Sequence, residues 1–158
     1  MTKRSIAVAL AALGFSLAAA ADDRLVRFDG GIGVIPTGSA NTTVRGVPAA
    51  GQIWVISRLS ADIRTDGSIS VDGRGLLLGA GNNVGFNANA RVFATLICEP
   101  ATPFPQHSTN LAGVALEPNG DFRINDVLTP VPAACASPVL LIRNAANGGW
   151  FAAGIPKQ

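Results

Sequence analysis

The segment ADIRTDGSISV, residues 61–71, decides the fold. A three-residue loop over 65–67, with Gly67 in the left-handed conformation that such loops need, places Ile63 opposite Ile69. The other apolar residues of the two arms then also face each other. A two-residue loop would slip the register and turn the apolar side chains toward water. The segment therefore predicts an antiparallel β-hairpin.

The segment VALEPNGDFRI, residues 114–124, repeats this arrangement. In its loop, Pro118 presets the first turn position and Gly120 supplies the positive φ. Leu116 then pairs with Phe122 across the hairpin. Two separate loops select their register by the same criterion, so the sequence predicts an antiparallel all-β protein.

Further strands are predicted by alternating polarity and by β-branched residues. In QIWVISRLSADIR, residues 52–64, the expected core face carries Ile53, Val55, Leu59, Ala61 and Ile63. The other expected strands are LVRF (25–28), GIGVIP (31–36), RVFATLIC (91–98), PVLLIR (138–143) and GGWFAAGI (148–155). Short strands separated by Gly, Pro and Asn turns predict an antiparallel β-sandwich, with a partly closed β-barrel as the alternative.

The glycine-rich stretch GRGLLLGAGNNVG, residues 73–85, has a spacing near that of a dinucleotide-binding loop. Such a loop needs a following helix whose N-terminus receives the phosphate. The residues that follow, NNVGFNANARVF, are poor helix formers. We therefore interpret the stretch as a strand that is re-aimed by a bulge at 73–75 and then enters a turn.

The first residues have the pattern of a secretory signal peptide: a basic start at Lys3 and Arg4, an apolar Ala-rich run, and small residues before ADD. We expect a signal peptide over 1–21, one domain over 22–158, no membrane span after cleavage, and a secreted or periplasmic location. Of 12 basic residues, removal of Lys3 and Arg4 leaves 10, against 10 acidic residues. The near-neutral domain lacks the concentrated basic surface that nucleic-acid binding requires.

The two cysteines, Cys98 and Cys135, are predicted to form a disulfide in an exported protein. The alternatives are a reactive thiol or a metal ligand, but two cysteines and the one histidine, His107, are too few for a closed zinc site. His107 lies in the Pro-rich segment PFPQHSTN, which we expect to be a solvated surface loop. We expect no cofactor and no metal.

A contact surface is predicted around Trp54 and Ile56, which alternation places on the face opposite the expected core. The alternative is that a second layer covers this face. Trp150 is a further candidate. The loop GNNVGFNAN adds amide side chains that either bind a polar ligand or serve as turn residues; they are Asn82, Asn83, Asn87 and Asn89. Asn41 begins an N-glycosylation sequon, which matters only in a host that glycosylates it.

Asp72 and Asp126 are the acids that turn chemistry and polar strand faces account for least. A hydrolase would need them in a cleft, but no nucleophile motif accompanies them. The sequence therefore favours an exported, non-enzymatic protein with a structural or binding role in the periplasm or at the cell surface. Its partner would be a protein or a cell-envelope ligand. The alternatives are a small secreted hydrolase and an inhibitor-type protein-binding module.

Several segments together resemble a family of small exported bacterial β-rich proteins with no assigned function. These segments are VRGVPAAGQIWVI, DGRGLLLGAGNNVG, FATLIC, LEPNGDFRINDVL, CASPVLLIRN and GGWFAAGI. The resemblance covers most of residues 22–158 and implies an exported β-rich domain. It carries no catalytic motif that could be transferred to this chain.

Overall fold

The protein is all-β in a computed structural model, which describes residues 23–37 and 42–157. The described residues contain no helix. Their strands are β1 (Arg24–Gly33), β2 (Trp54–Val55), β3 (Arg58–Arg64), β4 (Ser68–Arg74), β5 (Leu77–Leu78), β6 (Arg91–Ile97), β7 (His107–Ser108), β8 (Val114–Ala115), β9 (Phe122–Val127), β10 (Val139–Asn144) and β11 (Trp150–Lys157). The predicted signal peptide, residues 1–21, and Asn41 of the sequon lie outside the described residues. No described helix is long and apolar enough to cross a membrane.

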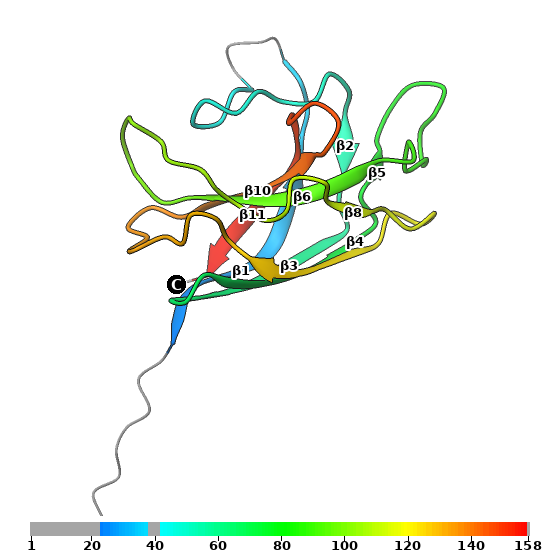
Figure 1. Cartoon of the computed structure of the whole chain (residues 1–158). Coiled ribbons are helices and arrows are strands. Elements are labelled where there is room, and N and C mark those ends of the chain that lie inside the picture. Colours follow the sequence, from blue (N-terminus) through cyan, green and yellow to red (C-terminus); the bar gives the residue numbers. More distant parts are fainter. Residues whose placement is uncertain (1–22, 38–41, 158) are drawn as a thin grey trace, which may run out of the picture.

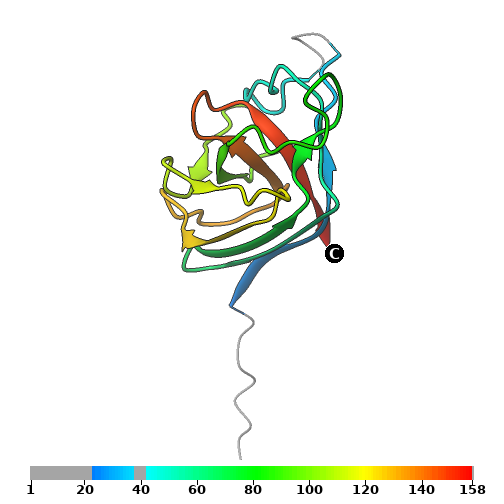
Figure 2. The same ribbon diagram turned by 90° about the vertical axis from the view of Figure 1, so that its right-hand side faces the viewer.

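One antiparallel sheet forms most of the molecule. Its strand order is β7-β6-β10-β11-β1-β3-β4-β9, and β8 also pairs with β6 (Figure 1). An isolated bridge between Ser108 and Thr129 joins β7 to the chain just after β9, so the two ends of the sheet meet. Viewed from another side, the strands curve around a common centre (Figure 2). The all-β prediction is confirmed, and the sheet takes the nearly closed barrel arrangement that was the alternative to a sandwich.

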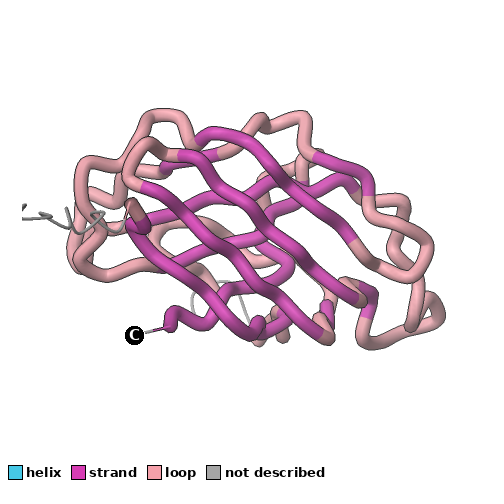
Figure 3. Tube along the Cα trace, turned by 90° about the horizontal axis from the view of Figure 1, so that it is seen from below, coloured by secondary structure: helices cyan, strands magenta, loops and turns pink. Residues whose placement is uncertain are grey.

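The barrel strands cross one face at a common slant, with loops at both ends (Figure 3). The hairpin of β3 and β4 has the predicted register, with Ile63 paired to Ile69 and Ala61 to Val71. Gly67 has the expected positive φ of 84°. All four paired residues are buried, because alternation turns one face of this hairpin into the barrel.

The second predicted hairpin forms its turn but not its ladder. Gly120 has a φ of 81°, and its N–H donates to the carbonyl of Glu117 at 2.8 Å. The predicted pairing of the two arms goes no further than the bond from the Glu117 N–H to the Asp121 carbonyl at 2.9 Å; beyond it the pairing is wrong, since β9 pairs with β4 over six positions and β8 pairs with β6. Leu116 and Phe122 are nevertheless both buried. Each arm has found a different partner while keeping its apolar side chain in the core.

The predicted strand 52–64 is broken into β2 and β3. β2 pairs with β5 in a separate two-stranded sheet. Within β2, Trp54 is buried and Val55 is 48% exposed, so the expectation that Val55 faces the core is wrong. The break at residues 56–57 shifts the alternation by one position. Leu59 and the rest of β3 face the core as expected.

The stretch 73–85 is a strand followed by a turn, as interpreted. β4 keeps regular pairing as far as Arg74, so there is no bulge inside its ladder. The chain is re-aimed one residue later, at Gly75, whose φ is 63°. This change of direction turns Leu76 and Leu78 into the core.

Candidate functional site

Cys98 and Cys135 form the predicted disulfide. The bond joins the end of β6 to the segment before β10, and the N–H of Ser137 donates to the carbonyl of Cys98 at 2.9 Å. The Arg45 guanidinium donates to the carbonyls of Ile97 and Ser137, which fastens the loop 42–50 over this corner. This region is a structural anchor.

His107 is buried, contrary to the solvated loop expected for it. His107 pairs with Leu96 as part of β7, and its Nδ1 lies 2.6 Å from the carbonyl oxygen of Pro130. A carbonyl accepts only, so Nδ1 carries the proton and donates. This bond holds the short β7 strand against the chain after β9.

Trp54 and Trp150 are not available to a partner in this structure. Trp54 is 4% exposed and stacks on Phe151, with ring centroids 3.9 Å apart. Trp150 is 8% exposed, and its indole N–H donates to the carbonyl of Thr42 at 2.8 Å. Ile56 is half-buried against the core. The side chains are covered, as the alternative expected, but by the core itself: both tryptophans belong to the same buried apolar cluster as Leu59, so Trp54 does not lie on a face opposite the core.

The Asn-rich loop remains exposed at Asn82, Asn83 and Asn89. Asn87 has a structural role: its amide nitrogen donates to the carbonyls of residues 116 and 117. The loop also exposes Phe86 (64%) and Val84 (58%), which sequence reasoning did not single out. Within residues 23–37 and 42–157, no three metal-ligating side chains gather.

Asp72 is held in an ion-pair network on the outer face of β4. Arg74 contacts it at 2.7 Å and Arg123 at 2.9 Å, and Arg74 also reaches Asp121 at 2.9 Å. The hydrogen bond from Arg74, opposed in part by desolvation, holds the pKa of Asp72 below its usual range. Both carboxylate oxygens of Asp72 therefore already accept hydrogen bonds from arginines.

Asp72 and Asp126 do not converge. Asp126 pairs with Ile69, a core-facing residue of β4, whereas Asp72 lies three positions further along β4 on the opposite face. Directly paired residues of an antiparallel sheet point to the same side. The two carboxylates therefore leave the sheet on opposite sides, and they form no common cleft.

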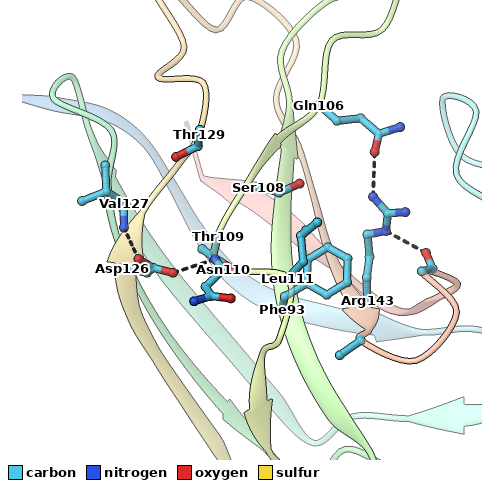
Figure 4. Close-up of a pocket in the computed structure, with 12 residues that line it drawn as sticks. Phe93, Gln106, Ser108, Thr109, Asn110, Leu111, Asp126, Val127, Thr129 and Arg143 are labelled. Carbon is cyan, nitrogen blue, oxygen red and sulfur yellow. Dashed lines mark hydrogen bonds between the residues drawn. The ribbon is translucent and has the colours of Figure 1, made fainter.

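A cavity of about 730 Å³ lies over the seam where β9, β7, β6 and β10 come together (Figure 4). Apolar side chains form its middle, and polar groups form its ends. Its lining residues are Phe93, Gln106, Ser108, Thr109, Asn110, Leu111, Asp126, Val127, Thr129, Arg143, Ala145 and Gly148. We refer to it as the seam pocket.

Arg143, at the end of β10, is the cation of the seam pocket. Its Nε donates to the carbonyl of Gly148 and its Nη1 to Gln106, both at 2.7 Å, with a longer bond to Thr95 at 3.3 Å. Its guanidinium carbon lies 5.1 Å from the ring centroid of Phe93, within cation–π range. The contacts fix the side chain and leave Nη2 without an acceptor in the described part of the chain.

Arg143 also lacks a countercharge among the described residues. It forms no ion pair with any described carboxylate, whereas Arg74 and Arg123, beside another cavity of about 640 Å³, are both ion-paired. Burial lowers the pKa of Arg143 from its ordinary value, because desolvation disfavours the charged form. An arginine nevertheless stays protonated in proteins. The pocket therefore holds a fixed, partly desolvated positive charge.

Asp126 is the anion of the seam pocket, on the side opposite Arg143 (Figure 4). Its two oxygens accept from the backbone N–H groups of Asn110 at 2.7 Å and Val127 at 2.8 Å. It forms no ion pair within residues 23–37 and 42–157. Asp126 was a predicted candidate, but Arg143 was not. The only sequence signal for Arg143 was a charge ending the otherwise apolar strand PVLLIR.

Comparison of the chain with protein-family models, with curated proteins and with solved structures gave no match. The seam pocket therefore has to be interpreted from its own geometry.

Proposed function

We propose that this is an exported, non-enzymatic binding protein whose seam pocket takes a small organic anion. The observation that carries the proposal is the fixed guanidinium of Arg143, which borders a cavity and whose Nη2 has no acceptor within residues 23–37 and 42–157. A carboxylate or phosphate would supply the acceptors that this group lacks, and charge-assisted bonds of this type are the stronger hydrogen bonds of proteins. The sequence predicted a protein or a cell-envelope ligand as partner, and the seam pocket favours an anionic one.

Export and the absence of catalysis are parts of the same proposal. The disulfide and the absence of a described membrane-spanning helix are compatible with an extracellular location. The hydrolase alternative loses support because Asp72 is committed to arginines and Asp126 lies on the other side of the sheet. The inhibitor-type alternative stays a prediction, and exposed Phe86 and Val84 are the features that favour it.

Titration calorimetry tests the proposal with carboxylates and phosphates, with and without a second charged group. We expect Arg143→Gln to weaken binding about tenfold or more, because it removes a charged hydrogen-bond donor. Arg58→Gln is the matched control, since Arg58 is exposed on β3 and does not line the seam pocket. Binding that survives Arg143→Gln unchanged, or a panel in which no anion binds the wild type, would refute the proposal.

A further inference from the structure

The seam pocket has two charges of opposite sign at its two sides, and neither is compensated by a charge in the described part of the chain. Arg143 and Asp126 form no ion pair with each other or with another described residue, and Phe93 and Leu111 lie between them (Figure 4). A partly buried charge without a partner costs free energy, which a ligand of complementary charge offsets. A plain anion would satisfy Arg143 alone and would leave Asp126 beside an apolar tail.

Both charged groups have hydrogen-bonding capacity to spare. Three of the N–H donors of Arg143 are used inside the protein, and both donors on Nη2 are free of described partners. Each oxygen of Asp126 accepts one backbone N–H, and a carboxylate oxygen accepts two bonds. One end of the pocket therefore suits a carboxylate, and the other suits an ammonium group, which only donates.

The spacing between the two ends favours an elongated ligand. The guanidinium of Arg143 lies over β6, where it contacts Thr95 and the ring of Phe93. Asp126 lies on β9, which the closure through β7 places two strands away from β6. Two strand spacings are about 10 Å. Between them, the exposed Leu111 offers an apolar surface to the middle of a ligand, and Phe93, which is only 4% exposed, lines the same pocket.

We infer that the seam pocket binds an elongated zwitterion, with its carboxylate on Arg143, its ammonium group on Asp126, and an apolar segment over Phe93 and Leu111. Two kinds of compound belong to this class: linear aliphatic acids that carry an amino group on the terminal carbon, and short linear peptides with free ends. The inference rests on the proposed function, because it specifies the ligand of the same pocket.

Calorimetry on the wild-type protein tests this inference with two zwitterions, aminohexanoate and aminooctanoate, each with its amine on the terminal carbon. Hexanoate and hexylamine are the single-charge compounds for comparison. We expect at least one zwitterion to bind about tenfold more tightly than both single-charge compounds. Asp126→Asn should reduce the affinity for that zwitterion to the hexanoate level and leave hexanoate binding unchanged or stronger. Asp29→Asn, which removes an acid on β1 that pairs with Lys157, is the control and should change neither affinity.

Hexanoate that binds as tightly as the zwitterions would overturn this inference and leave the proposed function standing. A wild-type protein that binds none of the anionic or zwitterionic compounds would overturn both. Because Asp126 also bonds to Asn110, its variant could lose stability. The comparison of ligands on the wild-type protein decides the question without that variant.

Discussion

The turns at Gly67 and Gly120 are alike in local geometry and differ in what their arms do. Their φ angles are 84° and 81°, and each glycine N–H donates to the carbonyl three residues earlier, at 3.0 Å and 2.8 Å. Beyond Gly67, β3 and β4 pair over six positions. Beyond Gly120, the arms part: β9 joins β4 and β8 joins β6. A turn is therefore encoded locally, while pairing is settled by competition for the edges of the sheet.

The parting of the second pair of arms creates the seam. Between β8 and β9, the backbone ladder ends at the bond from Glu117 N–H to the Asp121 carbonyl. Further along, the carboxylate of Asp126 bridges to the N–H of Asn110, and Ser108 and Thr129 close the barrel. The seam pocket lies at this irregular closure.

Gly120→Ala should have the largest effect on stability. The added Cβ would meet the backbone N and O of Leu76, each at 2.6 Å, and Leu76 N–H donates to the Gly120 carbonyl. Backbone atoms of a buried residue cannot move aside, so we expect a loss of about 3 kcal/mol or more. Urea unfolding measures it. A loss no larger than that of Gly81→Ala would show that the Gly120 turn is not locked to Leu76.

Gly67→Ala should cost less, roughly 1–2 kcal/mol for the left-handed conformation plus a small steric contribution. The added Cβ would meet only the Val131 side chain, at 2.9 Å, which is half-exposed and able to shift. Gly81→Ala is the matched control, because its φ is 79° and nothing lies within 4 Å of the added Cβ. Urea midpoints should rank wild type, Gly81→Ala, Gly67→Ala and Gly120→Ala in descending order. A Gly67→Ala variant with a lower urea midpoint than Gly120→Ala would contradict this ranking.

The smallest expected difference between the two turns is in how much stability each loses at acidic pH. Hydrogen bonds from Ser68 lower the pKa of Asp66 beside the first turn. Bonds from Arg74 and the Gly75 N–H lower the pKa of Asp121 beside the second, where Arg74 also lowers the pKa of Asp72. Each lowered pKa gives stability that is complete above the ordinary value of 3.8. That stability disappears as the pH falls below 3.8 through the folded-state pKa.

Urea midpoints at about pH 6 and about pH 2.5 measure this loss, which follows from proton linkage. Asp121→Asn should reduce the difference in urea midpoint between the two pH values more than Asp66→Asn does, since Asp121 shares Arg74 with a second carboxylate. Equal reductions by the two variants would mean that the network around the second turn adds nothing to the local turn bonds. The surface position of these groups keeps the effect below those of the glycine variants.

The candidate site shows the same difference between features that local sequence patterns predict and features that depend on tertiary packing. Alternation found the core residues of β3 and β4, because a strand with one buried face repeats every two residues. It failed at Val55, where a break over two residues changed the phase. Asp126 was a candidate because no turn explained it, and Cys98 and Cys135 because no third cysteine competed. Arg143 escaped attention, since nothing in PVLLIR tells whether a terminal arginine has a countercharge.

The sequence by itself determined the two glycine turns and the alternating strands of the first hairpin, because these depend on local dihedral preferences. It also determined the disulfide pair, because two cysteines allow one pairing within the chain. The tertiary structure alone decided that β8 and β9 separate and that both tryptophans are buried. It also decided that Arg143 and Asp126 border one cavity, with no ion-pair partner for either in residues 23–37 and 42–157. Those outcomes depend on which distant strand edges and countercharges are free. No short stretch of chain contains that information.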